Sequence, residues 1–211
     1  MKVLLLGATG LVGGEVLKLA LDHPQVTKII APVRKTFKIS HSKLESPVIN
    51  FDDFSDIAQD WQFDAVICAL GTTMKQAKSK NAFKKIDLEY PLAFAQLAKD
   101  KGCKIYALNS AVGANADSRI FYNQVKGQLE NQLTQLQFES LVFVRPGLID
   151  GDRKETRLGE SLGLKLSSLL KPVLPKSLQP NKAQDIAFHL LQGVISPVKG
   201  VQMIEAAQIH C

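Results

Sequence analysis

Residues 2–14 read KVLLLGATGLVGG, a short apolar run followed by glycines at positions 7, 10 and 13. The run has the length of a buried strand, and the glycines open a helical stretch. In this context Gly7 permits a tight turn, Gly10 lets the backbone approach a pyrophosphate, and Gly13 lets helix and strand pack closely. The stretch therefore predicts a strand–turn–helix unit that holds a dinucleotide at the positive end of the helix, with a ligand-free glycine turn as the alternative.

The remaining chain alternates short apolar runs with longer amphipathic stretches. The runs are rich in Val, Ile and Leu with little alternation, as parallel strands covered on both faces are. Expected strands are TKIIAPV (27–33), PVINF (47–51), DAVICAL (64–70), KIYALNS (104–110), SLVFVRP (140–146) and GVQMIEA (200–206); expected helices fall within 11–23, 81–102, 118–137 and 182–193. This rhythm predicts an α/β fold, a Rossmann-like doubly wound parallel sheet of about six or seven strands. We expect the whole chain, 1–211, to form one NAD(P)-binding domain, in which residues of about 151–211 form a small C-terminal lid or cap.

Bulk properties limit the classes of function. The 211 residues are 45% hydrophobic and carry a net charge of +6, but the lysines are spread out, which argues against nucleic acid as the main ligand. No apolar run is long enough to span a membrane. Cys68, Cys103 and Cys211 are scattered, so we expect no disulfide scaffold, no metal site and a cytoplasmic location.

The end of the second expected strand indicates which dinucleotide binds. An NAD-preferring site usually offers a carboxylate to the ribose there, whereas this chain has Arg34 and Lys35. A guanidinium suits the 2′-phosphate, so NADP(H) is preferred over NAD(H). A surface basic pair is the alternative. Asp52 and Asp53 follow the third strand, where they either reach the adenine or cap the next helix.

Three side chains after the fifth strand suggest acid–base chemistry. Ser110 ends that strand, and Tyr122 and Lys126 lie one turn apart in a helix expected to begin near Ser118. An ammonium beside a phenol favours the phenolate and brings proton transfer toward the working pH. Tyr122 would be the acid or base, Lys126 its tuner, and Ser110 the group that holds the substrate oxygen. A chance surface Tyr and Lys is the alternative.

These residues resemble the short-chain dehydrogenase/reductases, and more narrowly their atypical branch. The likeness runs nearly end to end, through GATGLVGG, CALGTT, NSAVGA, YNQVKGQLE, FVRPGLIDGDRKETRLGE and VQMIEAAQIH. It implies that the CALGTT loop lies near the cofactor ribose and Arg145 to Gly147 near the nicotinamide. The asparagine of the family's proton relay has no clear counterpart, although Asp87 occupies a comparable helix position.

Together, motif and resemblance define one predicted site. Its catalytic residues are Ser110, Tyr122 and Lys126. The predicted cofactor-binding residues are Gly7, Thr9, Gly10, Leu11, Val12, Gly13, Arg34, Lys35, Asp52, Leu70, Gly71, Thr72, Thr73, Tyr122, Lys126, Arg145, Pro146 and Gly147.

The leading function is an NADP(H)-dependent oxidoreductase acting on a small carbonyl or alcohol, as a monomer or homodimer. The alternatives are an NADP(H)-sensing module that binds a protein partner without turnover, and a cofactor-retaining epimerase or isomerase. Two charged segments each have two alternative roles. In 152–160, Arg153 and Arg157 either contact an anionic group or pair with neighbouring acids; the lysines of 75–85 either meet an anionic partner or form a solvated loop.

Overall fold

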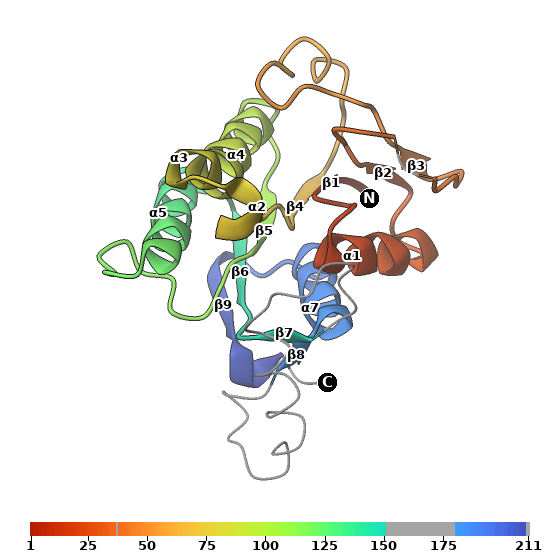
Figure 1. Ribbon diagram of the computed structural model, residues 1–211. Coiled ribbons are helices and arrows are strands. Elements are labelled where there is room, and N and C mark those ends of the chain that lie inside the picture. Colours follow the sequence, from red (N-terminus) through yellow and green to blue (C-terminus); the bar gives the residue numbers. More distant parts are fainter. Residues whose placement is uncertain (37, 151–179, 210–211) are drawn as a thin grey trace.

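Seven parallel strands form the central sheet of the computed structural model, which describes residues 1–36, 38–150 and 180–209 (Figure 1). Their spatial order is β3-β2-β1-β4-β5-β6-β9, and every neighbouring pair is parallel. The strands are β1 (Lys2–Leu6), β2 (Lys28–Ile30), β3 (Leu44–Glu45), β4 (Ala65–Cys68), β5 (Ile105–Asn109), β6 (Ser140–Arg145) and β9 (Gly200–Glu205). The strand order reverses between β1 and β4, and in open α/β sheets ligands bind outside the carboxyl ends of the strands at such a point.

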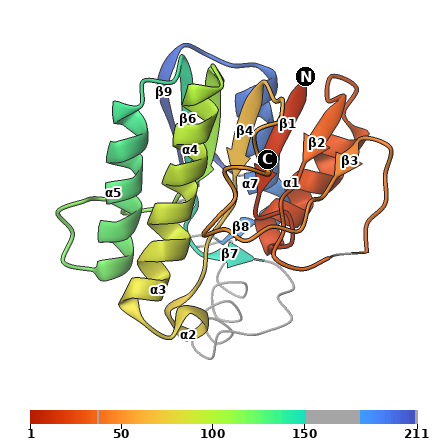
Figure 2. The ribbon, with the colours of Figure 1, turned by 90° about the horizontal axis from the view of Figure 1, so that it is seen from above.

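Helices cover both faces of the sheet, as Figures 1 and 2 show. On one face α1 (Leu11–Asp22) packs against α7 (Ala183–Ile195). On the other lie α4 (Tyr90–Asp100) and α5 (Phe121–Gln135). Shorter elements are α2 (Met74–Ala77), α3 (Lys80–Lys84), the π-helical turn η1 (Lys85–Glu89), the 3₁₀ turn η3 (Ala206–Gln208) and the two-stranded pair β7 (Ile149–Asp150) and β8 (Asn181–Lys182).

The two faces divide the apolar side chains of each strand between two cores. In β1, Val3 and Leu5 join the core under α1 and α7, while Leu4 and Leu6 join the core under α4 and α5. Full burial of such a side chain contributes about 1.5–3 kcal/mol. Because both faces are buried, these strands lack the apolar–polar alternation of a one-sided sheet. The predicted fold class is confirmed.

Several expected boundaries differ from the structure. The third strand is Leu44–Glu45 rather than 47–51, because pairing with β2 ends at Glu45 and Val48 makes only an isolated bridge with Val33. The helix expected over 81–102 consists of α3, η1 and α4 in succession. Helix α5 begins at Phe121, after the turn in which the Asp117 N–H donates to the Asn115 side chain.

The predicted lid or cap of residues 151–211 is described only from residue 180 to residue 209. Arg153, Arg157 and their acidic neighbours lie outside the described residues. Within the described part, α7 belongs to a main core and β9 extends the main sheet. No helix in the described ranges is long and apolar enough to cross a membrane.

Candidate functional site

The glycine turn has the geometry that its spacing predicts. Gly7 has φ +86°, a conformation that side chains disfavour, and a Cβ there would lie 2.7 Å from the Ala69 backbone. A Cβ on Gly13 would lie 2.0 Å from the Gly7 carbonyl oxygen, so only glycine allows this approach. Gly10 is the exposed N-cap of α1, whose first turn has no side-chain cap and no acidic residue. The first N–H groups of α1, from Leu11 to Gly13, are therefore suited to bind phosphate oxygens.

The residues expected around the adenosine half lie at the neighbouring strand ends. Arg34 and Lys35 are exposed just after β2, and exposed Thr9 lies in the glycine turn. Asp52 is already engaged: its carboxylate lies 2.7 Å from the Lys85 ammonium and accepts a 2.9 Å hydrogen bond from the Tyr90 hydroxyl. Asp52 caps no helix in this arrangement.

The loop after β4, from Leu70 to Thr73, lies next to the Lys126 side chain of α5. A Cβ on Gly71 would lie 3.4 Å from Asp87 Oδ1 and 4.0 Å from Lys126 Nζ. The Thr72 N–H donates to Asp87 Oδ2 at 2.8 Å, and the Thr73 hydroxyl caps α2. The predicted cofactor loop and the predicted catalytic lysine therefore share one partner, Asp87.

Lys126 is buried and paired. Its ammonium lies 2.9 Å from Asp87 Oδ1, and the two side chains are 4% and 1% exposed. Burial alone would lower the pKa of Lys126, but the negative charge of Asp87 and the nearby Tyr122 raise it above its ordinary value. Tyr122 itself is 37% exposed and packs edge-on against Phe83. The structure thus brings Tyr122 and Lys126 together at the carboxyl edge of the sheet, where the ion pair with Asp87 holds the lysine in place.

Ser110 takes part in a second buried network. Its backbone N–H donates to the Val144 carbonyl, and its hydroxyl donates to Glu130 Oε1 at 2.5 Å, a length typical of a bond to a charged oxygen. Glu130 in turn accepts two charge-assisted hydrogen bonds from the Arg145 guanidinium. The Ser110 hydroxyl proton is therefore engaged in the hydrogen bond to Glu130, and the lone pairs of Ser110 Oγ can still accept a hydrogen bond from another donor.

Arg145 to Gly147 act as a structural junction beside this network. Bonds to Glu130, together with an ion pair to Glu205 at 3.0 Å, raise the pKa of Arg145 further above its usual range. The Pro146 carbonyl accepts from Val112 in the loop after Ser110, and the Gly147 N–H donates to the buried Asn181. These residues hold the loops at the carboxyl edge in place.

Sequence reasoning missed the roles of Glu130 and the direct Asp87–Lys126 pair. Glu130 was detectable, because Tyr122, Lys126 and Glu130 follow one another at four-residue spacing on one helical face. Asp87 points inward from the π-helical turn η1. Such turns are frequent at functional sites, but no residue pattern in the sequence predicts them.

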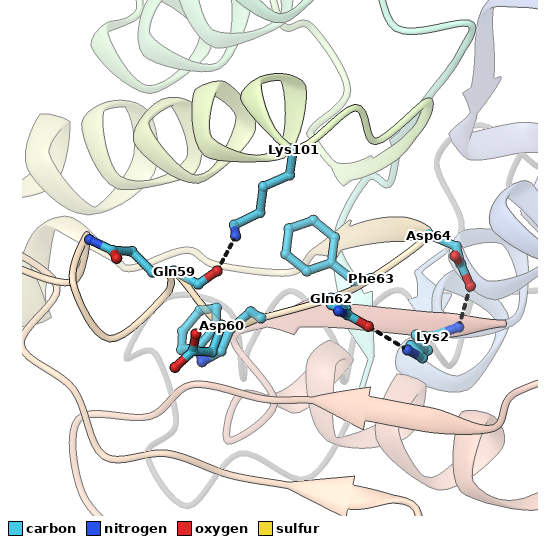
Figure 3. A pocket seen from close by; sticks show the side chains of 8 residues that line it. Lys2, Gln59, Asp60, Gln62, Phe63, Asp64 and Lys101 are labelled. Carbon is cyan, nitrogen blue, oxygen red and sulfur yellow. Dashed lines mark hydrogen bonds between the residues drawn. The ribbon is translucent and has the colours of Figure 1, made fainter.

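A cavity of about 490 Å³ lies at the opposite edge of the sheet, where the strands begin (Figure 3). Its polar lining is internally bonded: Lys2 contacts Gln62 and Asp64, and Lys101 donates to the Gln59 carbonyl. Chemistry in open α/β sheets occurs at the carboxyl edge, so this cavity is separate from the candidate site. Among the described residues, no group of three or more His, Cys, Asp or Glu side chains is arranged to hold a metal ion.

The fold, the glycine turn and the Tyr122–Lys126 pair define the class. The chain belongs to the NAD dependent epimerase/dehydratase family, whose model matches residues 3–129. Relatives include protein FMP52, mitochondrial, of Candida albicans, 36% identical over 82% of this chain and 82% of that protein. Protein HTATIP2 of Rattus norvegicus is 36% identical over 94% of this chain and 83% of its own length. The resemblance to atypical short-chain dehydrogenase/reductases is confirmed.

Solved structures agree on the fold. A short chain dehydrogenase family protein from Francisella tularensis covers 98% of both chains with a TM-score of 0.69 at 16% identity. MoeE5, in complex with UDP-glucose and NAD, covers 97% of this chain and 75% of its own, with a TM-score of 0.73 at 11% identity. At these identities the likeness concerns architecture alone.

The expected cytoplasmic location is wrong on this comparison. The FMP52 relatives from Candida albicans and Meyerozyma guilliermondii are both named mitochondrial proteins. The inference failed because free thiols such as buried Cys68 and Cys103 indicate a reducing compartment and do not identify which one.

Proposed function

We propose that this protein is an NADP(H)-dependent oxidoreductase that interconverts a small carbonyl compound and its alcohol. The observation that carries the proposal is the buried Lys126 beside a solvent-accessible Tyr122, at the sheet edge that also bears the glycine turn. Family membership supports a dinucleotide-binding, oxidoreductase-type fold. The preference for NADP(H) rests on Arg34 and Lys35, which are exposed where the 2′-phosphate would lie.

The residues divide the work in the following way. When bound, the nicotinamide supplies or accepts the hydride. Tyr122 donates a proton to the substrate oxygen in reduction and takes it back in oxidation. The positive charge of Lys126 stabilises the phenolate form of Tyr122. The backbone N–H groups of the glycine turn bind the pyrophosphate.

Ser110 acts as an acceptor in this scheme. The Ser110 hydroxyl already donates its proton in the hydrogen bond to Glu130, so it can only accept further hydrogen bonds. Ser110 therefore orients the site by accepting a hydrogen bond from the hydroxyl group of the alcohol substrate or of Tyr122. A ketone oxygen has no proton to offer, so in reduction the carbonyl depends on Tyr122 for its hydrogen bond.

The same contacts favour one second candidate, a nucleotide-sensing module without turnover. The Ser110 hydroxyl faces Glu130, and the Lys126 charge is shared with Asp87, so both groups already have strong internal partners. A sensor would bind NADP(H) but leave carbonyl substrates unchanged.

Calorimetric titration with NADPH and NADH tests the proposal. We expect NADPH to bind more tightly than NADH, and Arg34→Ala to weaken NADPH binding by roughly ten- to a hundredfold, the loss of a charge-assisted contact. NADH binding should change little. Lys104→Ala is the matched control, because Lys104 is an exposed cation just before β5 at the opposite edge of the sheet.

If Arg34→Ala and Lys104→Ala weakened NADPH binding equally, the effect of Arg34 would come from the overall charge of the protein and not from a specific contact. If neither nucleotide bound, the proposed function would be rejected. If NADPH binds, a screen of carbonyl substrates with Tyr122→Phe as the inactive control separates the enzyme from the sensor. Loss of turnover in a Tyr122→Phe variant that still binds NADPH is the result expected of an enzyme.

A further inference from the structure

The carboxylate of Asp87 joins Lys126 to the loop that follows β4. One oxygen lies 2.9 Å from the Lys126 ammonium and the other accepts the Thr72 N–H at 2.8 Å. Asp87 is 1% exposed, so water contributes almost nothing to screening these charges. A Cβ on Gly71 would lie 3.4 Å from Asp87 Oδ1 and 4.0 Å from Lys126 Nζ, so the backbone of Gly71 lies next to both charged groups.

A paired lysine differs physically from a free one. An unpaired ammonium favours the phenolate of a neighbouring tyrosine, whereas a carboxylate at contact distance cancels most of that field. Tyr122 therefore faces an ion pair whose two charges nearly cancel. Removal of the Asp87 charge would expose the full charge of Lys126.

We propose that Asp87 is a positioning residue that sets how readily Tyr122 releases its proton, by holding the Lys126 charge in a buried ion pair. This inference deepens the proposed function, on which it rests for the role of Tyr122 as acid. In this proposal, the π-helical turn η1 directs the Asp87 carboxylate toward Lys126. Because the Thr72 N–H donates to the same carboxylate, the loop after β4 and Lys126 share one buried group.

Few other charges compete for this role among the described residues. The groups that face Lys126 are Asp87 from η1, Tyr122 from its own helix and the buried thiol of Cys68 from β4, whose pKa burial raises. From α3, Lys80 lies over the ring of the residue next to Tyr122. Asp87 is the carboxylate in contact with Lys126.

The decisive measurement is an ultraviolet titration of the Tyr122 phenolate in the purified protein without ligand. Subtraction of the matched Tyr122→Phe variant removes the signals of Tyr90 and Tyr106. Asp87→Asn keeps the shape and an acceptor for Thr72 but removes the charge. We expect it to lower the titration midpoint of Tyr122 by roughly one to three pH units. Asp87→Glu, which keeps a carboxylate, should restore the midpoint toward the wild-type value.

A double variant covers the case in which Asp87→Asn does not fold. Asp87→Asn with Lys126→Met leaves no buried charge, and such neutral replacements of ion pairs are well tolerated. Because it exchanges one neutral pair for another, the Tyr122 midpoint should stay close to wild type. A midpoint that rises in the double variant would show that Lys126 acts without restraint from Asp87 and would overturn the proposal. So would an unchanged midpoint in a folded Asp87→Asn.

The matched control is Asp52→Asn, which removes a carboxylate from an exposed lysine pair and should leave Tyr122 unchanged. The titration needs neither cofactor nor substrate, so its outcome is separate from the proposed function. A shift in Tyr122 without NADPH binding would retain the charge assignment and reject the enzyme. Tight NADPH binding without a shift would reject only the inference.

Discussion

Two Asp–Lys–Tyr groups lie on either side of a single turn of this chain. The inner trio is Asp87, Lys126 and Tyr122, and the outer trio is Asp52, Lys85 and Tyr90. The π-helical turn η1 supplies one member to each, because Lys85 begins the turn and Asp87 lies two residues later. Their ion pairs have similar lengths, 2.9 Å and 2.7 Å between nitrogen and oxygen.

Burial separates the two trios. The paired side chains of the inner trio are 4% and 1% exposed, and those of the outer trio are 45% and 49% exposed. Water screens the outer charges, so their mutual attraction contributes little to stability. The inner charges have lost their hydration and depend on each other. Ion pairs of similar length therefore carry unequal energies, because burial of the inner pair removes the screening that water gives the outer pair.

The sharpest test removes one cation from each trio. Lys126→Met leaves Asp87 buried without its partner, and we expect a loss of about 3–5 kcal/mol in the free energy of unfolding. Lys85→Met should leave the urea unfolding midpoint nearly unchanged, since Asp52 stays hydrated. Equal losses in the two variants, measured by urea unfolding, would contradict the comparison.

The Glu130–Arg145 pair is an intermediate case, with side chains 5% and 17% exposed. Glu130→Gln keeps the shape but sets an amide against the guanidinium and weakens the bond to Ser110. We expect a loss of about 2 kcal/mol, the contribution of a hydrogen bond to a charged group. Urea unfolding measures it, with Gln128→Glu on the same helix as a control for helix composition. A loss smaller than that of Lys85→Met would contradict the ranking by burial.

The sequence predicted the parts of the site that depend on local spacing. The turn of Gly7 to Gly13 follows from backbone geometry, and the pairing of Tyr122 with Lys126 follows from helix periodicity. The doubly wound sheet was likewise readable from runs that are apolar on both faces. The catalytic and cofactor roles of these residues stay predictions, since the geometry brings them together without a ligand.

The rest depends on long-range partners that a sequence pattern does not contain. The partner of Ser110 is Glu130, twenty positions further on, and that of Lys126 is Asp87 in a different helical segment. A π-helical turn shifts the register of side chains by one residue, so an amphipathic pattern across 81–102 does not reveal that Asp87 faces inward. Strand β3 was misplaced because its extent is decided by pairing with β2 and not by its own apolar residues.

The smallest expected effect belongs to the outer trio and is a dependence on pH. The bond from Lys85, then that from Tyr90, lowers the pKa of Asp52 below its ordinary 3.8. The bond to Asp52 raises the pKa of Lys85 above 10.5. The stabilisation from Asp52 is therefore present above pH 3.8 and is lost as the pH falls through the folded-state pKa. That from Lys85 is present below pH 10.5 and is lost as the pH rises through its folded-state pKa.

Asp52→Asn should consequently differ from the wild type only between these two limits, and only slightly. Urea unfolding midpoints across pH, at low and at high salt, measure the difference. Because exposed charges are screened beyond about 3 Å at 1 M salt, the difference should vanish at high salt. A difference that survives high salt would mean that Asp52, Lys85 and Tyr90 are shielded from water in solution, and the contrast between the two trios would then rest on something other than burial.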